Sequence, residues 1–240
     1  MRSRVALTTS VLLCLVATAA AAGLPGTRLA VSTGAGDMAI ALVTAASGAM
    51  AGNGREFPAC ATCHGVNGEG NPLMGYPRLA GLPAKYLQTQ LNNFATGKRA
   101  DGTMTPISQS LSVDERRAIA GVYATLGPSG HHESVASARK PAPVMPGETL
   151  AVRGRWRDNL PACAQCHGNG ARGVGEAFPP LAGQSALYLE NQLRAWQSGT
   201  REPGPLGLMG SIARKLNADD VKAVAAYLSS LPLRGEGYSP

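Results

Sequence analysis

The sequence predicts an all-α protein built from two tandem copies of one domain. Matching motifs begin at residues 60 and 163. A period of about 100 residues suits two domains in series and is too long for a solenoid repeat. Apolar residues in several segments recur at spacings of three and four, as on the buried face of a helix. No segment shows the apolar–polar alternation that is typical of a half-buried strand.

The first 22 residues have the pattern of an export signal, which we assign to residues 1–22. Arg2 and Arg4 precede an apolar run, and small residues suitable for cleavage follow it. The apolar run is near the lower length limit for crossing a bilayer, so a cleaved signal is favoured over an uncleaved anchor. We expect an exported chain with at most peripheral membrane association.

Beyond the signal, we divide the chain into four segments. Residues 23–40 form a Gly/Thr/Ala-rich lead-in, and residues 41–127 form the first domain. Residues 128–147 contain four prolines and little apolar content, which indicates a linker. Residues 148–235 form the second domain.

Each half is expected to contain a helix after its motif and a closing helix. The first pair of helices covers residues 86–94 and 188–196. The closing helices begin at capping boxes, in which a polar N-cap residue precedes an acidic residue by three positions. These pairs are Ser112 with Glu115 and Asn217 with Asp220.

The repeated motif reads C-x-x-C-H, the attachment signature of a c-type haem. Two cysteines on one helical turn can form thioethers with the two vinyl groups of a porphyrin, and the next histidine can bind the iron. The cysteines are Cys60, Cys63, Cys163 and Cys166, and the histidines are His64 and His167. We therefore expect two covalently attached haem c groups. A zinc site at each motif would leave the repeat unexplained.

Composition and charge agree with this interpretation. Aromatic residues make up only 5% of the chain, so two porphyrins would supply apolar volume that the side chains lack. The fifth cysteine lies in the signal, which leaves no thiol for a disulfide or a sulfur ligand. The net charge of +7 falls to +5 without the two signal arginines, and four haem propionates would offset most of the remainder. No basic cluster is interleaved with aromatic residues, which argues against nucleic-acid binding.

Two methionines are candidates for the sixth iron ligand. Met104 and Met209 occupy matching positions after the two histidines, each in a Gly/Pro-rich stretch that we expect to be a loop before the closing helix. Core packing is the alternative role for a methionine. Met74 also follows the first motif closely, and whether it competes with Met104 stays open. His131 and His132 are weaker candidates, because they lie in the linker and have no counterpart in the second half.

Other repeated residues suggest how each haem would be held. The carbonyl groups of Pro77 and Pro179 can accept a hydrogen bond from Nδ1–H of the nearby motif histidine, which fixes the imidazole. Tyr86 and Tyr188 are expected to pack on the haem groups. Three arginines are either propionate partners or ordinary solvated side chains: Arg78, Arg99 and Arg201.

Histidine and methionine together would fill the coordination sphere of each iron. Such an iron has no open position for oxygen, peroxide or a substrate, so reversible one-electron transfer is the chemistry that fits. We expect an electron carrier without catalytic residues.

Taken together, the motifs resemble those of the cytochrome c4 family, which has tandem class I cytochrome c domains. The shared elements are C-x-x-C-H, Pro-x-Leu-Ala-Gly, Tyr-Leu-x-x-Gln-Leu and a loop methionine, over residues 53–126 and 156–231. The resemblance implies a periplasmic carrier with two low-spin His/Met haems. It also implies redox protein partners: a membrane quinol-oxidising complex or a dehydrogenase as donor, and a terminal oxidase as acceptor.

Two other functions remain open at this point. One is a dedicated cytochrome subunit of a periplasmic dehydrogenase. The other is a diheme enzyme, either peroxidase-like or thiosulfate-oxidising. The paired methionines and the absence of a spare cysteine argue against an enzyme, because an enzyme of this kind needs an accessible iron or an unusual ligand.

Overall fold

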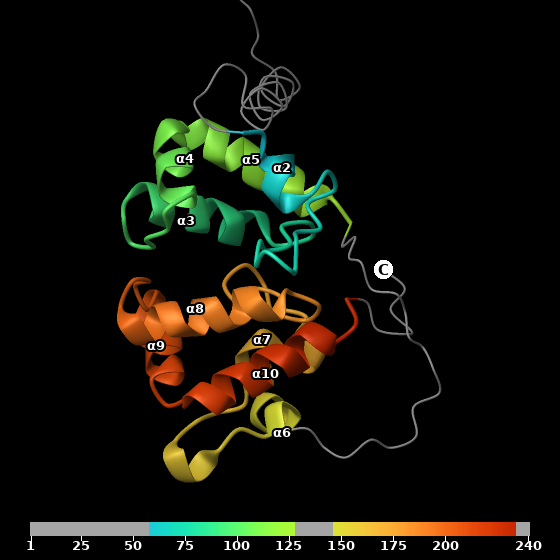
Figure 1. The fold of residues 1–240 in the computed structure, drawn as a ribbon, viewed down its shortest axis with the longest axis vertical. Coiled ribbons are helices and arrows are strands. Elements are labelled where there is room, and N and C mark those ends of the chain that lie inside the picture. Colours follow the sequence, from blue (N-terminus) through green and yellow to red (C-terminus); the bar gives the residue numbers. More distant parts are fainter. Residues whose placement is uncertain (1–57, 128–145, 234–240) are drawn as a thin grey trace, which may run out of the picture.

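A computed structural model describes residues 58–127 and 146–233, which form two helical halves (Figure 1). In these residues the backbone forms helices and four isolated β-bridges but no strand, which confirms the all-α prediction. The expected signal, the lead-in, the start of the first domain and both linker histidines lie outside the described residues.

The first half contains four helices around one apolar core. These are α2 (Cys60–His64), α3 (Ala84–Ala95), α4 (Met104–Ser110) and α5 (Val113–Thr125). Helix α3 packs against both α4 and α5. Leu87 of α3 and Ile119 and Tyr123 of α5 are buried in the core between them.

The described residues of the second half repeat this arrangement and include a further helix before the motif. Its α-helices are α6 (Pro146–Val152), α7 (Cys163–His167), α8 (Ala186–Ser198), α9 (Leu208–Ala213) and α10 (Ala218–Ser230). Three short 3₁₀ helices lie between them: η1 (Trp156–Asp158), η2 (Asn169–Ala171) and η3 (Pro205–Gly207). Helix α10 packs against α6 and α8.

Helix α6 begins inside the segment that the sequence assigned to the linker. Leu150 and Ala151 on this helix are buried in the core of the second half. Gly147 permits the close approach to α10, because a Cβ atom there would lie 2.0 Å from the carbonyl oxygen of Ala223. The packing against α10 therefore gives this stretch a structural role.

Both closing helices begin where the sequence predicts. Ser112 caps α5 and Asn217 caps α10, each in a complete capping box. In each box the N-cap side chain accepts from the N3 backbone N–H, and the N3 carboxylate accepts from the N-cap N–H. Within the described part of the chain, no helix is long and apolar enough to cross a membrane.

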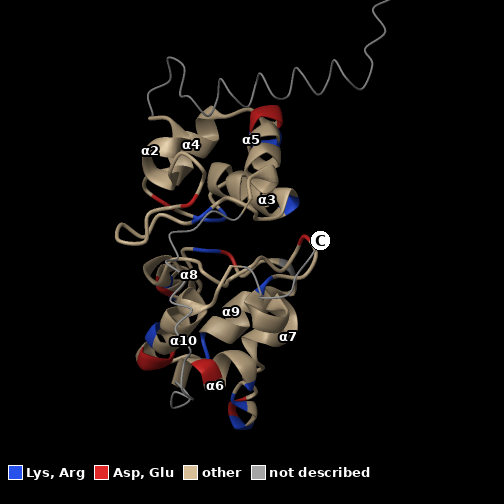
Figure 2. Ribbon diagram, turned by 90° about the vertical axis from the view of Figure 1, so that its right-hand side faces the viewer, with Lys and Arg blue, Asp and Glu red and all other residues tan. Residues whose placement is uncertain are grey.

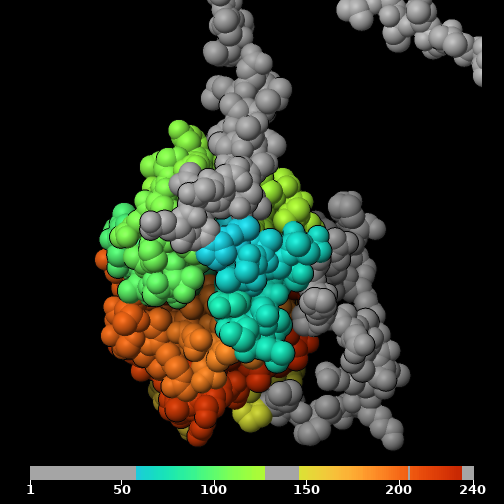
Figure 3. Space-filling model, turned by 45° about the horizontal axis from the view of Figure 1, so that its top comes forward, coloured from blue at the N-terminus to red at the C-terminus, as the bar shows by residue number. Residues whose placement is uncertain are grey.

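The two halves pack directly against each other (Figure 3). Helix α3 of the first half faces α8 of the second (Figure 1). Arg99 and Arg201 form an antiparallel β-bridge across the junction. The N–H of Ala100 donates to the carbonyl of Thr200 at 3.0 Å, and the N–H of Glu202 donates to the carbonyl of Lys98 at 2.8 Å. Equivalent segments of the repeat therefore meet at the junction.

Candidate functional site

The first motif places His64 at the end of the short helix α2. His64 is buried, and its Nδ1–H donates to the carbonyl oxygen of Pro77 at 2.9 Å. Gly70 lets the intervening loop reach this position. Its φ is +81°, and a Cβ atom there would lie 2.6 Å from the backbone nitrogen of Arg78. Glycine is therefore required where the loop returns beneath the histidine.

The second motif repeats this geometry. His167 ends α7, is buried, and donates from Nδ1–H to the carbonyl oxygen of Pro179 at 2.8 Å. Gly173 has a φ of +87°, and a Cβ atom there would lie 2.8 Å from Pro180. The loop after each motif thus ends at a proline carbonyl that orients the motif histidine.

The surroundings of both histidines favour the neutral imidazole. Burial lowers the pKa of His64, although the carbonyl of Pro77 and the charge of Asp101 act in the opposite direction. Burial likewise lowers the pKa of His167. A neutral ring that donates from Nδ1 keeps the Nε2 lone pair available for a metal ion.

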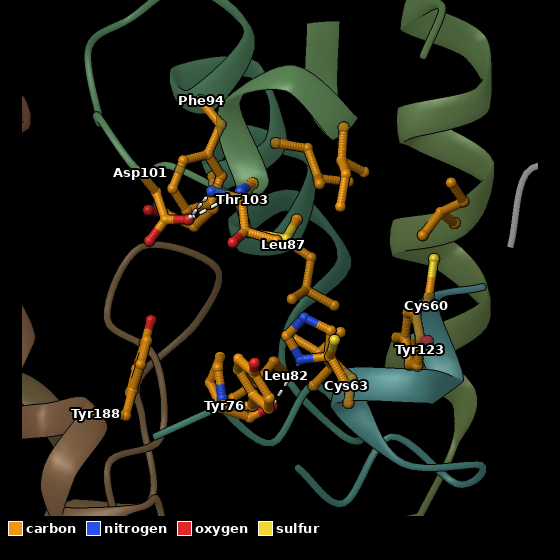
Figure 4. A pocket seen from close by; sticks show the side chains of 18 of the residues that line it. Cys60, Cys63, Tyr76, Leu82, Leu87, Phe94, Asp101, Thr103, Tyr123 and Tyr188 are labelled. Atoms are coloured by element: carbon orange, nitrogen blue, oxygen red, sulfur yellow. Dashed lines mark hydrogen bonds between the residues drawn. The ribbon is translucent and has the colours of Figure 1, made fainter. Parts of the chain in front are cut away.

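A cavity of about 290 Å³ lies beside His64 (Figure 4). Cys60, Cys63, His64 and Met104 all line it. Its walls are mainly apolar and include Leu79, Leu82, Leu87, Leu91, Phe94 and Ile119. Two thiols, an imidazole, a thioether and apolar walls form a set of groups that fits a covalently attached haem.

The thiols in this site do not resemble a redox dithiol. The four cysteines among the described residues are free. Burial raises the pKa of Cys60, and it raises the pKa of Cys163 to about 11. Reactive redox cysteines have lowered pKa values, so the raised pKa values of the half-buried Cys60 and Cys163 argue against that role for these two thiols.

The two candidate methionines near the first histidine differ in how deeply they are buried. Met104 is half-buried and lines the cavity as the first residue of α4. Met74 also lines the cavity, but its side chain is 62% exposed. Met209 is half-buried in α9. The loop prediction for Met104 and Met209 was wrong, because each lies in a short helix that precedes the closing helix.

Asp101 fixes the backbone at Met104. Its Oδ1 accepts from the N–H of Thr103 at 2.9 Å and from the N–H of Met104 at 2.8 Å (Figure 4). Pro106 can occupy the third position of α4, because the first N–H groups of a helix have no intrahelical partner. The repeat provides no signal for Asp101, because the corresponding residue of the second half is Pro203.

The arginines and glutamines of the repeat meet between the halves. Arg99 and Arg201 are both buried, which excludes the interpretation that they are solvated. The Oε1 atom of Gln90 accepts from both guanidinium groups, at 3.0 and 2.8 Å. The Oε1 atom of Gln192 does the same, at 2.7 and 2.8 Å. We call these four residues the arginine–glutamine cluster.

The second half also contributes to the first cavity. Tyr188 and Gln192 line it together with Tyr86 and Arg99 of the first half. The hydroxyl of Tyr188 accepts from Nη2 of Arg99 at 2.9 Å. Neither Arg99 nor Arg201 forms an ion pair with a carboxylate of the described residues. The cluster is therefore positively charged at the edge of the cavity.

Comparison with known proteins identifies the family. A model of the cytochrome c family matches residues 51–121 and 146–232, which is more than half of the chain. The chain belongs to the cytochrome c family. It has two cytochrome c domain regions, binds two covalent haem c groups and is a diheme cytochrome of the cytochrome c4 type that transfers electrons.

Two relatives and one solved structure illustrate the similarity. The thiosulfate dehydrogenase electron acceptor of Thiomonas intermedia is 46% identical, over 80% of this chain and 88% of that protein. Cytochrome c4 of Pseudomonas aeruginosa is 35% identical, over 79% of this chain and 92% of that protein. The structure of the thiosulfate dehydrogenase TsdBA of Marichromatium purpuratum aligns with 40% identity and a TM-score of 0.70. The alignment covers 80% of this chain but only 40% of that longer chain.

Proposed function

We propose that this diheme cytochrome is the periplasmic electron acceptor of a thiosulfate-oxidising dehydrogenase. The supporting observation is the higher identity to the electron acceptor of Thiomonas intermedia, 46%, than to cytochrome c4 of Pseudomonas aeruginosa, 35%. We therefore favour a dedicated dehydrogenase as the donor of electrons to this cytochrome. A terminal oxidase is the proposed acceptor of the electrons.

In this proposal the two motifs hold the haem groups in equivalent ways. Cys60 and Cys63 form the thioethers to the first haem, and Cys163 and Cys166 form those to the second. His64 with Met104 ligates the first iron, and His167 with Met209 ligates the second. The half-buried position of both methionines and the buried histidines support this assignment.

When bound, each haem supplies an iron that accepts and releases one electron. The protein contributes a fixed ligand geometry, because the carbonyls of Pro77 and Pro179 hold the two imidazole rings in place. The walls of the first site are mainly apolar, which suits a porphyrin ring. Arg99 at the edge of that cavity is placed to receive a propionate, which would supply the anion that the arginine–glutamine cluster lacks.

A general respiratory carrier is the second candidate. The similarity to cytochrome c4 over 79% of this chain favours it. In that case a membrane quinol-oxidising complex would be the donor. Two protein ligands on each iron argue against a peroxidase-like or thiosulfate-oxidising enzyme, because neither iron would have an open position.

Stopped-flow reduction of the oxidised, haem-loaded chain distinguishes the two candidate donors. We expect purified thiosulfate dehydrogenase with thiosulfate to reduce both haems rapidly, and thiosulfate alone to leave them oxidised. A quinol-oxidising complex with quinol serves as the matched donor. Faster reduction by that complex than by the dehydrogenase would contradict the proposal and favour the general carrier.

A further inference from the structure

A second cavity, of about 150 Å³, lies between the two halves. Arg78 and Gly81 of the first half line it, together with Arg172, Pro180, Ala182 and Leu233 of the second half. None of these residues lines the cavity beside His64. No acidic residue belongs to this lining.

Arg78, one of the three arginines considered as propionate partners, does not line the first haem cavity and is a buried cation without a negative partner among the described residues. Only 3% of its surface is exposed. Its two terminal nitrogens donate to the backbone carbonyls of Ala80 and Ala182, and its Nε atom has no hydrogen-bond partner. Burial lowers its pKa to about 10, so the group remains charged at neutral pH. A buried charge needs a counter-charge to offset its lost hydration.

Arg172 brings a second positive charge to the same cavity. It is exposed, and no ion pair of the described residues includes it. These two arginines are not equivalent positions of the repeat. The residue that corresponds to Arg78 in the second half is Pro180, and the one that corresponds to Arg172 in the first half is Glu69.

We propose that this cavity binds a small divalent oxyanion of the sulfate class between the guanidinium groups of Arg78 and Arg172. Planar, multidentate guanidinium donors match the oxygens of such an anion. The volume accommodates one tetrahedral anion with some water, since a water molecule takes up about 30 Å³ in the liquid. Because the two arginines belong to different halves, the bound anion stabilises their packing.

Sulfate binding to the full, haem-loaded chain tests this site. Isothermal titration calorimetry with sodium sulfate, at constant ionic strength set with sodium chloride, should show one site per chain. Arg172→Gln should weaken binding at least tenfold. Arg157→Gln is the matched control, because the Arg157 side chain is 83% exposed and does not line the cavity. Its sulfate affinity should equal that of the unmodified chain.

Thermal unfolding provides the second readout. Sulfate should raise the midpoint of the unmodified chain and of Arg157→Gln more than chloride does at equal ionic strength. The unfolding midpoint of Arg172→Gln should be the same in sulfate as in chloride. The proposed site would be contradicted if sulfate did not bind, or if sulfate and chloride raised the unfolding midpoint equally. It would also be contradicted if Arg172→Gln and Arg157→Gln bound sulfate with equal affinity. Neither readout uses an electron donor, so failure here is distinct from failure of the proposed function.

Discussion

At the scale of single residues, the two methionines beside the first site differ in burial and therefore in their expected roles. Met104 is half-buried at the start of α4, whereas Met74 is largely exposed near the tip of a loop. Oδ1 of Asp101 accepts from the N–H groups of both Thr103 and Met104, whereas the exposed Met74 has a single longer bond, from its N–H to Oδ1 of Asn71 at 3.2 Å. This difference underlies two predictions.

Met104→Ala should open the first iron while leaving the second closed. Carbon monoxide should then bind to one of the two haems in the reduced protein, and the ferric Met–iron absorption band should fall to about half, in line with one His/Met iron of two. Absorption spectroscopy measures both effects. Met74→Ala is the control and should keep the full band. If Met74→Ala opens the iron instead, the axial assignment is wrong.

Asp101→Ala should loosen Met104 without removing it. The variant loses an acceptor for two backbone N–H groups, and each such hydrogen bond contributes about 1 kcal/mol. We expect part of the Met–iron band to disappear at a lower temperature than in the unmodified chain. Asp101→Asn retains the Oδ1 acceptor and should restore the band. Identical melting of the band in both variants would contradict this positioning role.

Sequence reasoning located the motif residues but not Asp101. The proline carbonyls opposite His64 and His167 were predicted because the repeat places a proline after each motif. Asp101 has no counterpart in the second half, so comparing the halves could not reveal it. Its role depends on how the chain folds back toward α4, which residue types alone do not specify.

At the scale of elements, the starts of the two closing helices were predicted correctly. Capping boxes depend on side chains three positions apart and on the adjacent backbone, so the starts of α5 and α10 could be read locally. The short helices α4 and α9 were missed, because glycine and proline nearby indicate a loop. Their helical form depends on tertiary contacts, such as the packing of α4 on α3 and of α9 on α8.

Ser112→Ala should remove the N-cap of α5 and lower the free energy of unfolding by about 1 kcal/mol. Guanidinium chloride denaturation followed by circular dichroism measures the change. Ser230→Ala is a matched control at the other end of a helix, since the Ser230 hydroxyl only donates to the carbonyl of Tyr227. Its effect should stay below about 0.5 kcal/mol. Equal losses would exclude a specific capping contribution.

Asp220, at the start of α10, makes the stability of the fold depend on pH. Hydrogen bonds from Arg155 are the main reason that the pKa of Asp220 lies below its ordinary value of 3.8. The ionised carboxylate therefore stabilises the fold above that value, and this stabilisation is lost as the pH falls through the lowered pKa. Thermal unfolding between pH 7 and pH 2 should show a smaller acid-induced loss in Asp220→Asn. An unchanged pH profile would contradict this contribution.

At the scale of the whole molecule, the arginine–glutamine cluster joins the two halves, because each glutamine oxygen accepts from one arginine of each half. Figure 2 shows basic residues on both sides of the junction. The sequence indicated the duplication but not this contact, because equivalent residues from two copies give no signal of meeting each other. The cluster forms only when α3 and α8 face one another.

A double-mutant cycle on the cluster should measure this coupling. Gln90→Ala and Gln192→Ala each remove an oxygen that bridges both guanidinium groups. Because the two glutamines share their partners, the free energies of unfolding should be non-additive by at least about 0.5 kcal/mol. The visible spectra of the variants verify that haem attachment is unchanged. Additive effects would show that the two bridges act independently.

The position of Tyr188 and Gln192 in the wall of the first cavity has a consequence for how this gene can be divided. A fragment encoding only the first copy would lack part of its own cofactor chamber, although it would retain the complete attachment motif. Duplication has thus made one copy a component of the other. A gene fragment must therefore encode both domains if the first cavity is to be complete.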